Sequence, residues 1–180
     1  VSREVIDGLL KSESGNSLAE IEARIDETTA PASFELSKHR VDLEVEIKPT
    51  VADTSNVLGM IPGRGDLADQ TIVVGAHYDH VGMGGYGSLA PGTVAIHNGA
   101  DDNASGTVTM LQIAERMKEA LGEVASHRRL LFIAFTGEER GLIGSKHYVD
   151  NPLFPLANTA AMVNLDMVGR LRDNELTVYG

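Results

Sequence analysis

The sequence predicts an α/β sandwich with a mostly parallel sheet. Three apolar runs, TIVVGA, LLFIAFTG and AAMVNL, have the continuous pattern of strands that are buried on both faces. A helical pattern from about residue 104 to 121 separates the first two runs, and LIGSKHYVD predicts a short helix after the second. Buried strands that alternate with helices are typical of a parallel sheet covered by helices.

The N-terminal part of the chain has a different pattern. Residues 1–30 predict amphipathic helix, and Ser17 followed by Glu20 is a capping-box signature ahead of apolar positions. The stretch VDLEVEIK (41–48) alternates apolar and acidic residues, which predicts a half-buried antiparallel or edge strand. We therefore expect a helical segment over 1–40 and a core over 41–180, with a weak boundary near residue 50.

Three further elements complete the expected core. NVLGMIP (56–62) predicts another strand, and the GRGD that follows predicts a turn. In the helix over 104–121 the apolar face is expected to carry residues at helical spacing, namely Val108, Leu111, Ala114 and Met117. ELTVYG, at the end of the sequence, predicts the start of a fourth buried strand.

Composition excludes several classes of function. With 15 Lys and Arg against 26 Asp and Glu, the net charge is −11, which argues against nucleic-acid partners and against anchoring on anionic lipid. No apolar run reaches the length of about 18 residues that a membrane span needs. No signal peptide is visible and the chain lacks an initiator Met, so we expect a processed or trimmed chain. Because there is no Cys, any metal must bind through His, Asp or Glu.

Ionisable residues follow each of the predicted buried strands. His77 ends the first strand, Glu138 and Glu139 follow the second, and Asp166 follows the third. The carboxyl ends of strands form the ligand-binding edge of an open α/β sheet. One such residue alone is usually a helix cap or a satisfied polar group, but the coincidence at several strand ends indicates a shared site.

The loop before the long helix adds Asp101 and Asp102, either of which could simply cap that helix. So many carboxylates repel one another unless a cation compensates them. One His with several oxygen ligands favours zinc and leaves manganese or cobalt open.

The motifs AHYDHVG, IHNGADDNASG, AFTGEERGLIGSKHY and NLDMVGR follow one another over residues 41–180. In this order they resemble the co-catalytic di-zinc aminopeptidases, family twenty-eight of the metallopeptidases. The resemblance implies a three-layer α/β/α sandwich of the zinc exopeptidase (phosphorylase/hydrolase-like) type. It also implies hydrolysis of N-terminal peptide bonds by a water that bridges two zinc ions. Residues 1–30 are similar to the tail of a protease-associated domain, and members with that domain are generally exported, so we expect a secreted or periplasmic protein.

The resemblance assigns roles by motif position. It implies that His77 and Asp166 bind the first zinc, that Asp102 bridges both ions, and that Glu139 binds the second. Asp101 is then a neighbour that shapes the turn.

The same motifs imply two residues that do not bind metal. Glu138 is implied as the general base, which takes a proton from the attacking water and passes it to the leaving amine. Asp79 is expected to accept the second ring N–H of His77 and thereby fix its tautomer.

One ligand of the family's second zinc is missing, because it is a His from a late loop and no His follows Asp166. We therefore expect a truncated catalytic domain that is weakly active or inactive by itself and that self-associates through an unpaired sheet edge beginning at ELTVYG. His80 is an alternative ligand that the family motif assigns to a loop role. His97 is expected to support the metal loop, although a second zinc would need a ligand from His97 or from a neighbouring chain.

Other functions remain open from the sequence. A carboxypeptidase, an aminoacylase or a glutaminyl cyclase could use the same scaffold, and their pockets lie largely beyond residue 180. A catalytically incompetent binding or scaffold protein would usually have substituted ligand positions, whereas the motifs here are intact. A calcium-binding structural domain is disfavoured by His77, since calcium prefers oxygen ligands.

Overall fold

A computed structural model describes residues 1–40, 42–171, 173–175 and 178 of the chain. The chain forms two compact units, Val1–Val51 and Ala52–Gly180. This division lies beside the weak boundary expected near residue 50. Within the described residues, no helix combines the length and hydropathy that crossing a bilayer requires.

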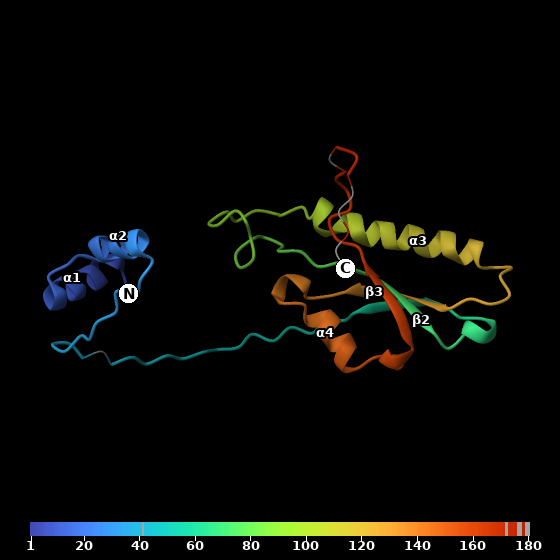
Figure 1. Cartoon of the computed structure of the whole chain (residues 1–180), viewed down its shortest axis with the longest axis horizontal. Coiled ribbons are helices and arrows are strands. Elements are labelled where there is room, and N and C mark those ends of the chain that lie inside the picture. The colour runs from blue at the N-terminus through green and yellow to red at the C-terminus, as the bar shows by residue number, and fades with distance from the viewer. Residues whose placement is uncertain (41, 172, 176–177, 179–180) are drawn as a thin grey trace. The chain divides into compact units, whose positions relative to one another are not determined.

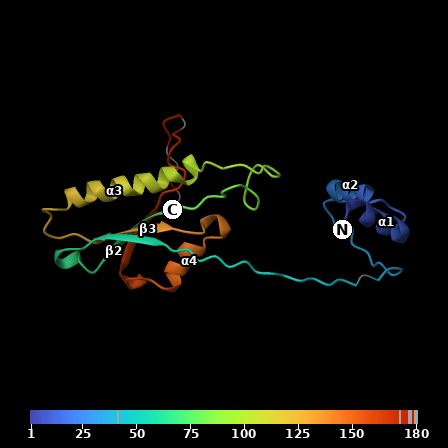
Figure 2. The ribbon, with the colours of Figure 1, turned by 180° about the vertical axis from the view of Figure 1, so that it is seen from behind.

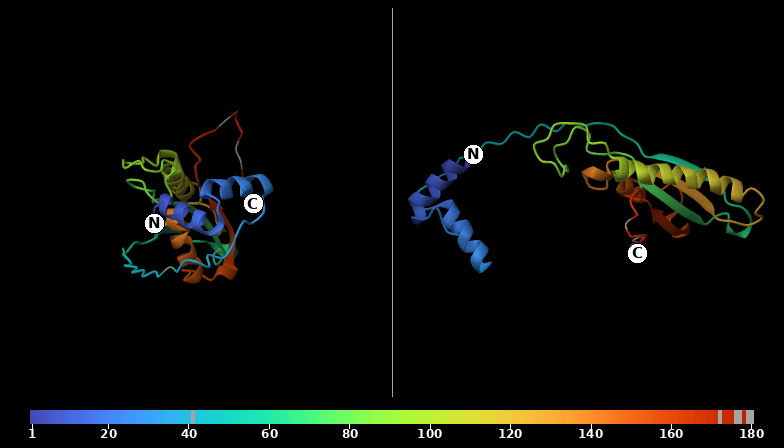
Figure 3. Two further views of the ribbon diagram at one scale, coloured as in Figure 1. Left: turned by 90° about the vertical axis from the view of Figure 1, so that its left-hand side faces the viewer. Right: turned by 90° about the horizontal axis from the view of Figure 1, so that it is seen from above.

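The first unit consists of two helices, α1 (Arg3–Ser14) and α2 (Leu18–Thr28), that join at an angle (Figure 3, right). The backbone nitrogen of Ser17 donates to the Glu20 carboxylate at 2.7 Å, and the Glu20 nitrogen donates to the Ser17 hydroxyl at 3.2 Å. These reciprocal bonds confirm the predicted capping box. Ile21 is the buried residue of this helix pair.

Glu13, near the end of α1, holds the segment that follows the helix pair. Its carboxylate accepts hydrogen bonds from the Ser37 hydroxyl at 2.7 Å and from the Lys38 backbone nitrogen at 3.2 Å. The Ser37 hydroxyl, with further donors from Lys38 and His39, lowers the pKa of Glu13 to about 2.

The strand predicted over 41–48 is wrong for the residues that the structure describes, because residues 42–48 form no strand. The apolar residues of the pattern face solvent, with Leu43 75%, Val45 66% and Ile47 82% exposed. Val41 lies outside the described residues. Alternation marks one face of a segment, but a strand also needs a neighbour to pair its backbone groups.

The second unit is built on a mixed sheet of β1 (Val57–Ile61), β2 (Thr71–His77), β3 (Arg129–Phe135) and β4 (Thr159–Asn164). Among the described residues the strand order is β1-β3-β2-β4. β2 is parallel to β3 and to β4, whereas β1 is antiparallel to β3. The predicted, mostly parallel sheet is therefore confirmed.

Helices cover both faces of this sheet, with α3 (Gly106–Ala120) along one face and α4 (Ile143–Asp150) against the other (Figures 1 and 2). Alternate residues of the central strands pack toward opposite faces, so the core has two apolar clusters. The cluster under α3 contains Met110 with Val74, Ala76, Leu130 and Phe132. The cluster under α4 contains Tyr148 with Val73, Leu131, Ile133 and Phe135.

The expected apolar face of α3 was partly wrong. Ala114 and Met117 pack against the sheet as predicted, whereas Val108 and Leu111 are 52% and 60% exposed. Met110 is the helix residue buried most deeply in the core, at 3% exposure. Ile113 also packs against the sheet, so the buried face follows the helical spacing i, i+3, i+4 and i+7 counted from Met110.

The prediction that AAMVNL is buried on both faces is also wrong. Among the described strands β4 lies at the edge of the sheet, and Met162 and Val163 are 51% and 50% exposed. A continuous apolar run predicts a strand, but how deeply that strand is buried depends on the elements that cover its faces. The fourth strand expected at ELTVYG falls largely outside the described residues, which omit 176–177 and 179–180.

Candidate metal centre

The polar residues of the motifs gather at one edge of the sheet. His77 is the last residue of β2, Glu138 lies in a tight turn after β3, and Asp166 follows β4 by two residues. Because these three strands are parallel, their carboxyl ends meet at the same edge. Asp102 reaches this edge from the segment that leads into α3. The structure thus brings together the residues that the sequence placed at one site.

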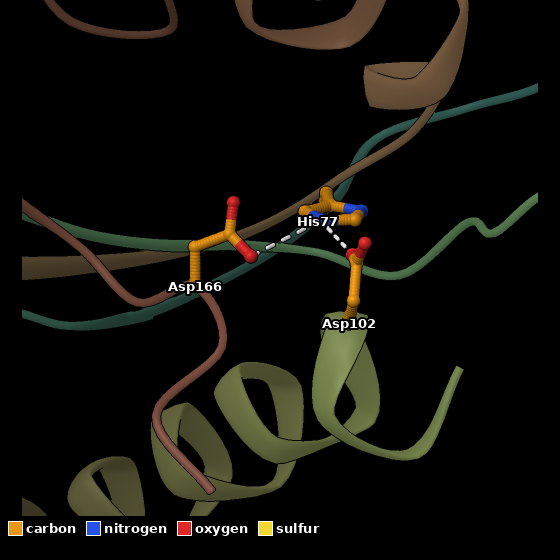
Figure 4. Close-up of side chains that lie close together, drawn as sticks. All are labelled: His77, Asp102 and Asp166. Carbon is orange, nitrogen blue, oxygen red and sulfur yellow. Dashed lines mark ion pairs between the residues drawn. The ribbon is translucent and has the colours of Figure 1, made fainter. Parts of the chain in front are cut away.

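His77 lies between two carboxylates (Figure 4). Its Nε2 is 3.2 Å from Oδ1 of Asp102 and 3.5 Å from Oδ1 of Asp166. Its Nδ1 is 3.0 Å from the backbone carbonyl oxygen of Asp79, which can only accept a hydrogen bond. Nδ1 therefore carries the proton, and Nε2 presents its lone pair to the carboxylates.

This arrangement fits a metal ion. The His77 side chain is 3% exposed, and its Nε2 is buried without a hydrogen-bond partner among the described residues. A buried nitrogen lone pair that faces two carboxylates is unfavourable unless the nitrogen gains a proton or a metal cation lies among these groups. Two ligand atoms on a tetrahedral zinc are about 3.3 Å apart, given bonds of about 2.0–2.1 Å. The separations of 3.2 Å and 3.5 Å between Nε2 of His77 and the two carboxylate oxygens lie on either side of that value.

A second cluster shares Asp102 with the first. Ligand atoms of His80, Asp102 and Glu139 all lie within 4.8 Å of one another. Nδ1 of His80 is 2.7 Å from Oε1 of Glu139. From the sequence, His80 is an alternative ligand that the family motif assigns to a loop role. No spacing rule could have indicated its approach to Glu139, because the two residues are 59 positions apart.

Glu138 belongs to neither cluster among the residues that the structure describes. It instead lines a hollow of about 130 Å³ together with His77 and Asp166. Partial burial raises the pKa of the Glu138 carboxyl, and the negative charges of Glu139, Asp166 and Asp102 add to the rise, while His77 opposes it. The two adjacent glutamates therefore have different surroundings: Glu138 lies beside the hollow, and Glu139 lies in a group of side chains that could hold a metal ion.

Asp79 acts differently from the expectation. Its carboxylate Oδ1 is 3.8 Å from Nδ1 of His77, which bonds to the Asp79 carbonyl instead. The carboxylate accepts hydrogen bonds from the backbone nitrogens of Glu138 at 3.1 Å and Glu139 at 3.3 Å. These bonds occupy both oxygens, so Asp79 holds the turn that carries the glutamates as well as orienting His77.

Asn103 is a structural residue of the site that the sequence analysis did not identify. Its side chain is 2% exposed and donates to the carbonyl oxygen of Leu165 at 2.9 Å. Its amide oxygen accepts from the nitrogens of Gly106 at 3.0 Å and Met167 at 3.2 Å. Asn103 thereby joins the start of α3 to the segment after β4, which fixes Asp102 and Asp166 relative to each other.

Asp101 and His97 support the surrounding loops. Asp101 forms an ion pair with Arg170 at 2.5 Å and accepts from the Gly169 nitrogen at 2.8 Å, and Arg170 lowers the pKa of its carboxyl. Nδ1 of His97 is 2.9 Å from the Ala95 carbonyl oxygen, and Nε2 is 2.7 Å from the Ser88 hydroxyl. Both ring nitrogens of His97 are thus engaged within its own loop.

The fold and this site define an α/β protein with a histidine–carboxylate cluster that could hold a metal ion at the carboxyl edge of its sheet. The sequence profile of peptidase family M28 matches residues 56–180. The chain belongs to peptidase family M28.

Several curated proteins are similar in sequence. Aminopeptidase YwaD of Bacillus subtilis is 35% identical over 75% of this chain and 26% of its own length. Leucine aminopeptidase 1 of Uncinocarpus reesii is 32% identical over 74% and 31%. A probable zinc metalloprotease of Phaeosphaeria nodorum is 31% identical over 68% and 25%. The chain thus spans between a quarter and a third of the length of these relatives.

A solved structure, that of a Zn-dependent exopeptidase from Parabacteroides distasonis, also matches. It has 24% sequence identity and a TM-score of 0.49, and the match covers 63% of this chain and 41% of that one.

Proposed function

We propose that this chain carries the metal centre of a zinc aminopeptidase that hydrolyses the N-terminal peptide bond of peptides. The observation that supports this proposal best is the buried, unpartnered Nε2 of His77 between Asp102 and Asp166. Membership of peptidase family M28 and relatives named as aminopeptidases favour this reaction over the others that the sequence left open.

His77, Asp102 and Asp166 would hold a first zinc, and Asp102 would share a second with Glu139. When bound, zinc supplies Lewis-acid polarisation of the scissile carbonyl and lowers the pKa of the attacking water. Asp102 belongs to both clusters, which suits a carboxylate that two ions would share.

Glu138 performs the proton transfer in this proposal. It faces the hollow beside His77 and Asp166 but stands outside both clusters, so its carboxylate is free to accept a proton. It takes the proton from the attacking water and delivers it to the leaving amine. Asp79 keeps Glu138 in place through its hydrogen bond to the Glu138 backbone.

The test is hydrolysis of L-leucine p-nitroanilide by the native protein, purified from the cells that produce it. We expect chelation to abolish hydrolysis and zinc to restore it. Glu138→Gln should lower kcat by roughly 10²- to 10⁴-fold, the usual contribution of a general base, while zinc content stays at the wild-type level. Hydrolysis that survives chelation, or an unchanged kcat in Glu138→Gln, would refute the proposal.

A further inference from the structure

The loop between β3 and α4, which carries Glu138, is closed by backbone hydrogen bonds. At its two ends, the nitrogen of Gly144 donates to the carbonyl oxygen of Thr136 at 2.8 Å. Further into the loop, the nitrogen of Leu142 donates to the carbonyl oxygen of Glu138 at 3.0 Å. The position of Glu138 therefore depends on how firmly the two ends of this loop are held together.

The side chain of Asn56, directly before β1, bridges the two ends of the loop. Its Oδ1 accepts a hydrogen bond from the backbone nitrogen of Thr136 at 3.1 Å, and its Nδ2 donates to the carbonyl oxygen of Gly144 at 2.8 Å. The first partner can only donate and the second can only accept, so the two together fix the orientation of the amide. The fit is close, because a Cβ added at Gly144 would lie 2.3 Å from Oδ1 of Asn56.

The conformation of the loop requires such support. Leu142 has a φ of +59°, in the left-handed region that is unfavourable for a residue with a side chain and persists only where the surroundings impose it. Leu142 lines the same hollow as Glu138. If the bonds at the ends of the loop broke, Leu142 would be free to leave this conformation, and Glu138, to which it is bonded, would move with it.

We propose that Asn56 is a positioning residue for Glu138, and that it acts by holding the two ends of the loop together. This inference rests on the proposed function, because it takes Glu138 as the general base. Asp79 holds the backbone of Glu138 within the loop, and Asn56 holds the ends. A general base must lie within hydrogen-bond reach of the proton that it takes, and a displacement of about 1 Å can lower the rate by about 10²-fold.

The experiment measures kcat and KM for L-leucine p-nitroanilide in the native protein and in two variants of Asn56. Asn56→Ala removes both hydrogen bonds. Asn56→Asp keeps the acceptor for Thr136 but removes the donor to Gly144, so it tests the same contact if Asn56→Ala does not fold. Circular dichroism at the assay temperature shows whether each variant is folded. We expect kcat to fall by about 10²-fold and KM to stay unchanged, as for the loss of an interaction that is made only in the transition state.

A double-mutant cycle with Glu138→Gln separates positioning of the base from a general effect on the fold. Because Asn56 acts through Glu138, adding Asn56→Ala to Glu138→Gln should cause no further loss of the residual kcat. The matched control is Asn151→Ala. Asn151 follows α4 directly, and its amide donates to the carbonyl oxygen of His147 at 3.2 Å, within the same helix end. We expect this variant to keep the wild-type kcat.

Three results would overturn the assignment. The first is a wild-type kcat in folded Asn56 variants. The second is an equal fold-loss of kcat when Asn56→Ala is added to Glu138→Gln, which would mean that Asn56 acts through other groups. The third is failure of both variants to fold, which would make Asn56 a residue of the fold alone. An unchanged kcat in Glu138→Gln by itself would instead overturn the proposed function, so the two failures are distinguishable.

Discussion

The carboxylate of Asp79 accepts a hydrogen bond from the backbone nitrogen of Glu138 at 3.1 Å. Its other oxygen accepts from the Glu139 nitrogen at 3.3 Å. This one side chain therefore holds the turn in which the proposed base and a proposed ligand are adjacent, and its backbone carbonyl meanwhile fixes the tautomer of His77.

Asp79→Asn should destabilise the chain, because the new amide turns an NH₂ group toward one of the two backbone N–H donors. We expect a loss of about 1–3 kcal/mol in the free energy of unfolding, the usual cost of losing a hydrogen bond to a charged group. Chemical denaturation of the metal-free chain measures it. The control is Asp69→Asn, at an exposed position in a turn. Equal stability of the two variants would contradict the role of Asp79.

Gly106→Ala should disrupt the metal centre without altering any ligand. An added Cβ would overlap the carbonyl oxygen of Leu165 and the amide oxygen of Asn103. We expect a destabilisation of about 1–3 kcal/mol, typical of overpacking, and weaker zinc binding, since Asp102 and Asp166 lie on the two segments that are forced apart. Gly59→Ala is the control because nothing lies within 4 Å of its added Cβ. Wild-type zinc affinity in Gly106→Ala would refute this account.

Glu138→Gln should change how the stability of the metal-free chain depends on pH. Partial burial raises the folded-state pKa of Glu138, so its contribution to stability is present below the unfolded pKa of about 4.3 and is lost as pH rises through the folded pKa. Wild type and Glu138→Gln should therefore be similarly stable near pH 4, and the variant should melt at the higher Tm near pH 7. Thermal melts at pH 4 and pH 7, in the presence of a metal chelator, measure this difference in Tm. A Tm difference that does not change with pH would contradict it.

The first unit offers an independent pH test at Glu13. Its carboxylate is held ionised by donors from Ser37 and Lys38, and its pKa is lowered to about 2. The contribution of Glu13 to stability is thus present above the unfolded pKa of about 4.3 and is lost as pH falls toward 2. The amide proton shift of Lys38, followed by NMR, should titrate with a midpoint near 2 and should lose this titration in Glu13→Gln. A midpoint near 4.3 would show that the contact is not formed.

The sequence predicted several elements of both units well because their signals are local. The apolar runs at β2 and β3 are buried as expected, and the capping box of α2 formed because its two hydrogen bonds join residues only three apart. The convergence of His77 and Asp166 was also predictable, since parallel strands bring their carboxyl ends to one edge.

Other features depend on neighbours that a linear pattern does not identify. The alternation around Leu43 predicts a strand, but the described residues there have no strand beside them. Met162 was expected to be buried and is exposed, because β4 is at the edge of the sheet that the described strands form. The approach of His80 to Glu139 depends on how two loops fold against each other, and the role of Asn103 depends on a contact with Leu165 across 62 positions.

Asp102 gives the most direct test of the central claim, because it is the residue that both clusters share. The measurement is zinc content per chain, by elemental analysis after exhaustive dialysis, for wild type and Asp102→Ala. We expect two ions in wild type and the loss of both in Asp102→Ala, because each cluster would lose a carboxylate. Zinc content that Asp102→Ala leaves unchanged, or a wild-type chain without zinc, would contradict a metal centre at this edge of the sheet.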